Sequence, residues 1–118
     1  KSIAYDDRHE NKDAADLVHV IRYAGDLEWV AARFAERIAA GQHVDAIEEA
    51  LAALHRRFCD GKGVEGHLRD GPVSCGMFAH GPGAEKEDDR VLEQRNVSGL
   101  VTEFLRLLKD LRDRAKTI

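Results

Sequence analysis

The chain has 118 residues, 43% apolar and 34% charged, a composition that excludes a disordered tail and fits one domain. The net charge of -4 disfavours a protein that coats nucleic acid without sequence specificity. The sequence has no run of 18 apolar residues such as a membrane-spanning helix requires. Only 6% of the residues are aromatic, which favours closely packed helices over a β-sandwich. We therefore expect an all-α fold.

Hydrophobic spacing predicts helices throughout the first half of the chain. A short helix within residues 1–10 should be followed by helices over 11–24, 26–40 and 45–58. Asn11 and Asp26 are expected N-caps, because their side-chain oxygens accept bonds from exposed N–H groups, and Gly41 is an expected stop. Asp45 and Glu48 have the spacing of a capping box at the start of the third of these helices.

The composition changes at residue 59. Residues 59–84 contain most of the ten glycines and both prolines, so we expect a Gly-rich loop with a short helical turn at 64–68. A long helix over 85–116 follows, with acidic residues at its start and basic residues at its end, as the helix dipole favours. The whole chain, 1–118, is predicted to be a single domain, an irregular bundle of four main helices with the C-terminal helix lying across the others.

The strongest local pattern lies in the first seventeen residues. Asp13 and Asp16 are three residues apart, so both carboxylates share one helix face. Lys1, Arg8 and Lys12 lie close by in sequence. Cations beside paired carboxylates suit phosphate handling. The alternative is a solvated helix start whose surface ion pairs contribute little.

This pattern resembles the third and fourth motifs of the AbiEii-type nucleotidyltransferases, the toxin halves of bacterial toxin–antitoxin pairs. The third motif contains a Lys, a small residue and an Arg, and the fourth contains a basic residue, an Asp and a later Asp-Leu. The residues that carry the resemblance are Lys1, Ala4, Arg8, Lys12, Asp13, Asp16 and Leu17. Beyond these residues the resemblance concerns the order of the segments. The Val20–Tyr23 stretch continues the motif helix, and a long helix closes the chain.

The resemblance implies a full-length enzyme that transfers a nucleoside monophosphate from an NTP to an acceptor such as tRNA, using Mg2+. Lys1 would contact the triphosphate and Asp13 would be the essential acid, with Arg8, Lys12 and Asp16 supporting substrate binding. The family's Gly-Gly and Asp-x-Asp motifs, which hold the metal, do not occur in this sequence. The chain, which begins with Lys1 rather than Met, would therefore be the C-terminal part of a longer protein. It would be inactive alone, and an antitoxin is a possible partner.

Two other functions are considered. The chain is alternatively a standalone helical module that binds a protein partner through an exposed apolar stripe and has no enzymatic activity. A weaker option is a ribonuclease, because the spacing of Arg37 and His43 resembles the Arg-x4–6-His signature of the helical HEPN family. Gly41 lies between the two residues and is expected to end their helix, which disfavours that geometry.

Three further patterns have simpler structural explanations. Residues 61–66 match the letters of a dinucleotide fingerprint, but that motif requires a preceding strand, so a loop is expected. A zinc site would have to draw on the irregularly spaced His55, Cys59, His67, Cys75 and His80. Cys59 is more simply a small buried hydrophobic residue at a helix end. Two cysteines are too few for a fold stabilised by disulfides. We therefore expect free thiols in a reducing compartment, and hence a cytoplasmic protein.

The basic end of the long helix has two interpretations. It would contact RNA phosphates if the whole enzyme binds tRNA. Otherwise it is a solvated helix end that complements its own dipole, since acidic residues are interleaved with the basic ones. The basic residues are Arg106, Lys109, Arg112, Arg114 and Lys116.

Overall fold

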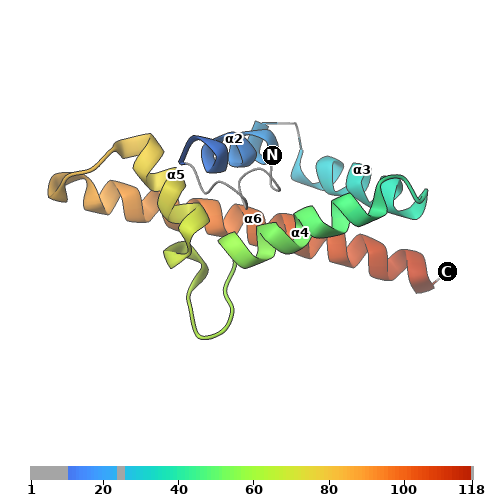
Figure 1. Cartoon of the computed structure of the whole chain (residues 1–118). Coiled ribbons are helices and arrows are strands. Elements are labelled where there is room, and N and C mark those ends of the chain that lie inside the picture. The colour runs from blue at the N-terminus through green and yellow to red at the C-terminus, as the bar shows by residue number, and fades with distance from the viewer. Residues whose placement is uncertain (1–10, 24–25, 118) are drawn as a thin grey trace.

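The computed structural model describes residues 11–23 and 26–117, and this part of the chain is built from helices (Figure 1). The α-helices are α2 (Asn11–Tyr23), α3 (Leu27–Ala39), α4 (Val44–Phe58), α5 (Asp70–His80) and α6 (Glu87–Thr117), with 3-10 turns at Gly66–Leu68 and Ala84–Lys86. The all-α prediction is confirmed. The short helix expected within 1–10 lies outside the described residues. No described helix is long and apolar enough to cross a membrane.

Helix α6 is the axis on which the other helices pack. Its 31 residues span about 46 Å at the usual rise per residue, close to the 52 Å long dimension of the molecule. Helices α2, α3, α4 and α5 all contact it, and Figure 1 shows it running the full width of the fold. The prediction that the C-terminal helix lies across the others is confirmed.

The core follows an apolar stripe along α6. Its fully covered positions repeat at helical spacing, and they are Val97, Val101, Phe104 and Leu108. Phe58 at the end of α4 is 0% exposed and belongs to the same cluster. Phe34 of α3 meets Phe104 edge-to-face, with ring centroids 5.5 Å apart. Each of the five described α-helices therefore contributes at least one buried side chain to one shared core, although α5 contributes only Cys75.

Two predicted helix boundaries are confirmed by their caps. Asp26 accepts a hydrogen bond from the N–H two residues later, at 2.8 Å, at the start of α3. At the other end the N–H of Gly41 donates to the carbonyl of Ile38 at 3.1 Å, and φ +73° at Gly41 turns the next peptide back toward the helix. The N–H of Gln42 reaches the carbonyl of Arg37 at 3.0 Å. These two bonds form a Schellman motif, which ends the helix.

The start of α4 differs from the predicted capping box. The helix begins at Val44, its N-cap residue is His43 at φ 53°, and no side chain caps it. Asp45 is already the second helical residue, two positions after the N-cap, so it cannot act as the cap. Its carboxylate still lies in the first turn, where the helix dipole favours negative charge.

The segment predicted as a Gly-rich loop contains an additional helix, α5. Pro72 is the third residue of α5, within the first turn, where N–H groups have no partner in the helix. Gly71 and Gly76 are buried against neighbouring backbone. A Cβ on Gly71 would lie 2.6 Å from the carbonyl oxygen of Arg57, and a Cβ on Gly76 would lie 3.0 Å from that of Arg90. These two glycines allow close helix packing rather than a turn.

Candidate functional site

The predicted site residues group on α2 as far as the structure describes them. Lys1 and Arg8 lie outside the described residues. Helix α2 begins at Asn11, so Lys12 and Asp13 lie in its first turn, although their side chains are outside the described part. Asp16 lies three residues after Asp13, and its side chain is half-buried. Of the five predicted residues, Asp16 is the one whose surroundings are described.

Asp16 lines a hollow of about 430 Å³ that is open to solvent. Helices α2, α5 and α6 form its walls, and these helices contact one another in pairs. Volumes of this order are typical of small-molecule sites. Its lining residues are Ala15, Asp16, Val18, His19, Arg22, Tyr23, Cys75, Phe78, Ala79, Glu93 and Val97. We call this feature the α2–α5–α6 hollow.

An ion pair crosses the α2–α5–α6 hollow. The guanidinium of Arg22 on α2 lies 3.4 Å from the carboxylate of Glu93 on α6, and both side chains are partly covered. One turn apart on α2, His19 and Tyr23 pack ring against ring, with centroids 4.7 Å apart. The hollow thus combines charged groups with aromatic surface.

Cys75 is a buried thiol in the wall of this hollow. Burial, and secondarily the negative charge of Glu93, raise the pKa of Cys75 to about 12, while the positive charge of Arg22 acts in the opposite direction. The thiol is therefore protonated at neutral pH, and a protonated thiol is a poor nucleophile. Cys75 contributes apolar surface to the wall of the hollow.

Sequence reasoning missed most of this hollow. In the sequence, Arg22 and Tyr23 stand out only as part of the stretch that resembles the family, and Phe78 lies in the segment predicted as a loop. Glu93 lies 71 residues from its partner Arg22, and no local pattern connects them. A sequence signal existed only for α2, whose helical spacing placed residues 16, 19 and 23 on one face.

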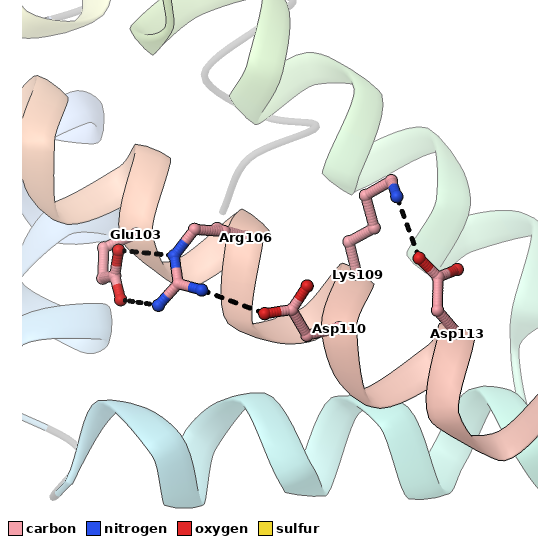
Figure 2. A network of polar contacts seen from close by, with 5 residues as sticks. All are labelled: Glu103, Arg106, Lys109, Asp110 and Asp113. Carbon is pink, nitrogen blue, oxygen red and sulfur yellow. Dashed lines mark hydrogen bonds and ion pairs between the residues drawn. The ribbon is translucent and has the colours of Figure 1, made fainter.

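The basic residues at the end of α6 are largely ion-paired (Figure 2). Arg106 bonds Glu103 and also reaches Asp110 at 2.9 Å, and Lys109 reaches Asp113 at 2.9 Å. The guanidinium of Arg112 lies 2.8 Å from Glu48 of α4. The side chain of Lys116 is outside the described part. Neutralised pairs of this kind favour the interpretation of a solvated helix end over an RNA-binding surface.

The other singled-out patterns have structural roles. Residues 61–66 follow helix α4 rather than a strand, and Gly61 and Val64 exchange two backbone bonds around a tight turn. Cys59 is buried as predicted, which raises its pKa, and it accepts a bond from the Thr102 hydroxyl at 3.5 Å. Within the described ranges, no three His, Cys, Asp or Glu side chains gather closely enough to hold a metal ion.

The ribonuclease-like pair is separated by a helix end. Arg37 lies in the last turn of α3, whereas His43 follows the Schellman motif at Gly41 and precedes α4. Both side chains are exposed. The signature requires both residues to lie on one helix, and Arg37 and His43 do not.

No protein-family model, curated protein or solved structure matches the chain.

Proposed function

We propose that this chain is the C-terminal helical part of an AbiEii-type nucleotidyltransferase. In full length the enzyme would be cytoplasmic and would transfer a nucleoside monophosphate from an NTP to an acceptor such as tRNA. The observation that carries the proposal is the placement of α2. This helix begins at Asn11, so the residues of the fourth motif occupy its first two turns, and Asp16 opens onto the α2–α5–α6 hollow.

The residues of this chain would bind and orient the nucleotide. Asp13 is the proposed acid, and Lys1, Arg8 and Lys12 are the proposed phosphate contacts, since cations stabilise the charge on a transferring phosphoryl group. Mg2+ would supply charge neutralisation at the α-phosphate and would be held mainly by residues outside this chain. An antitoxin is a possible partner, and this chain alone is expected to be inactive.

Radiolabelled NTP transfer tests the proposal. Intact mass and N-terminal analysis of the native protein first establish its full length. That protein is then incubated with labelled NTP, Mg2+ and total tRNA, and Asp13→Ala and Asp16→Asn are compared with wild type. Glu49→Gln is the matched control, because Glu49 is an exposed carboxylate on α4, away from the hollow.

We expect Asp13→Ala to abolish labelling, Asp16→Asn to weaken it, and Glu49→Gln to leave it unchanged. Unchanged labelling in Asp13→Ala rejects the assigned role of Asp13. A native protein that begins within a few residues of Lys1 rejects the whole proposal, because the metal-binding motifs would then be missing.

A standalone interaction module is the second candidate, and exposed apolar side chains favour it. Tyr23, Phe78 and Leu92 are each more than half exposed, whereas Phe58 and Phe104 are almost completely buried. A native protein that begins near Lys1 and shows no NTP transfer, yet forms a stoichiometric complex with a partner protein through this surface, would support the module.

A further inference from the structure

Two exposed aromatic side chains line the α2–α5–α6 hollow from different helices. Tyr23, the last residue of α2, is 67% exposed, and Phe78 on α5 is 57% exposed. By contrast, Phe58 and Phe104 are almost completely buried in the core. Large aromatic rings left in water beside a hollow offer flat apolar faces on which a planar ring can stack.

The polar groups of the same hollow suit the edge of a planar ring. Arg22 supplies N–H donors and Glu93 supplies carboxylate acceptors. The bond at 3.4 Å joins one nitrogen of Arg22 to one oxygen of Glu93. A guanidinium has several N–H donors and a carboxylate accepts at both oxygens, so each group retains hydrogen-bonding capacity for a ligand. A nucleobase presents donors and acceptors side by side on one edge, and Arg and Glu are both residues that read such edges.

We propose that the α2–α5–α6 hollow binds the base of a nucleotide. The base stacks on Tyr23 and Phe78, and Arg22 and Glu93 hydrogen-bond to its edge. Asp16 lines the same hollow, so the base site adjoins the residues of the fourth motif. The inference rests on the proposed function for the class of ligand, while the aromatic and charged groups that carry it belong to the described structure.

Binding to the 118-residue chain tests the base site without requiring catalysis. AMP, CMP, GMP and UMP are titrated by calorimetry and by NMR of the tyrosine and phenylalanine ring protons, with ribose 5-phosphate as the probe that lacks a base. Tyr23→Ala and Phe78→Ala should each weaken nucleotide binding by about 5- to 150-fold, the loss expected for one stacked base. Tyr23→Phe should retain binding, because the ring face remains.

Trp29→Ala is the matched control. Trp29 is also an exposed aromatic residue, at 53%, but it lies on α3, where Arg33 covers its ring, and it does not line the hollow. The Trp29→Ala variant should bind nucleotides as tightly as the wild type does. Far-UV circular dichroism confirms that each variant is folded.

Three results overturn the inference: no nucleotide shifts the aromatic resonances at millimolar concentration, ribose 5-phosphate binds as tightly as the nucleotides, or Trp29→Ala loses as much affinity as Phe78→Ala. The two proposals fail separately. Base binding by this chain without NMP transfer by the full-length protein rejects only the proposed function. Transfer without base binding by this chain rejects only the base site.

Discussion

Replacing Gly71 by alanine tests the close packing that lets α5 form. Gly71 is buried where the first turn of α5 crosses the end of α4. A Cβ at this position would lie 2.6 Å from the carbonyl oxygen of Arg57 and 2.7 Å from two ring carbons of Phe58. Neither neighbour can move easily, because one is backbone and the other is a fully buried ring.

The expected cost follows from overpacking. Adding a methyl group to a filled site typically lowers the free energy of unfolding by about 1–3 kcal/mol. Gly99 provides the matched control, since it lies in the middle of α6 with nothing within 4 Å of an added Cβ. At such a site alanine should raise the free energy of unfolding by about 0.5–1 kcal/mol, because it restricts the unfolded chain.

Urea unfolding followed by circular dichroism measures both effects. We expect Gly71→Ala to lower the urea midpoint and Gly99→Ala to raise it. The slope of the unfolding free energy against urea concentration should be unchanged in both variants. The same chemical change would thus act in opposite directions at two helical glycines. Midpoints that move in the same direction, or a Gly71→Ala protein as stable as wild type, would contradict the packing explanation for α5.

Two further predictions concern Cys75 and Arg90. Burial raises the pKa of Cys75 from 9.0 to about 12, so the folded chain retains the thiol proton to a higher pH than the unfolded chain does. The free energy of unfolding should therefore fall as the pH rises from about 9 toward 12, and a Cys75→Ala variant should show a shallower fall in urea titrations across that range. Equal slopes would contradict this. Arg90 donates to the carbonyls of Gly81 and Gly83, both at 2.8 Å, across the α5–α6 junction. Arg90→Met should cost roughly 1–3 kcal/mol and speed amide hydrogen exchange at that junction, whereas unchanged exchange would show that the junction holds without it.

The candidate site was predictable only in part. The spacing of Asp13 and Asp16 predicted a shared face on the helix now described as α2, because residues three apart on a helix are always neighbours. The hollow next to Asp16 was not predictable, since Phe78 and Glu93 come from other helices. Side chains so far apart in sequence meet only after the helices pack.

Much of the fold was decided by the sequence alone. The apolar stripes of α3, α4 and α6, the cap at Asp26 and the stop at Gly41 are local features, because helical periodicity and capping involve residues within a turn of one another. Tertiary structure decided α5. A buried glycine and a turn glycine look alike in a sequence, and only the distance from Gly71 to the backbone of α4 distinguishes them. Packing likewise left Tyr23 and Phe78 beside one hollow instead of within the core.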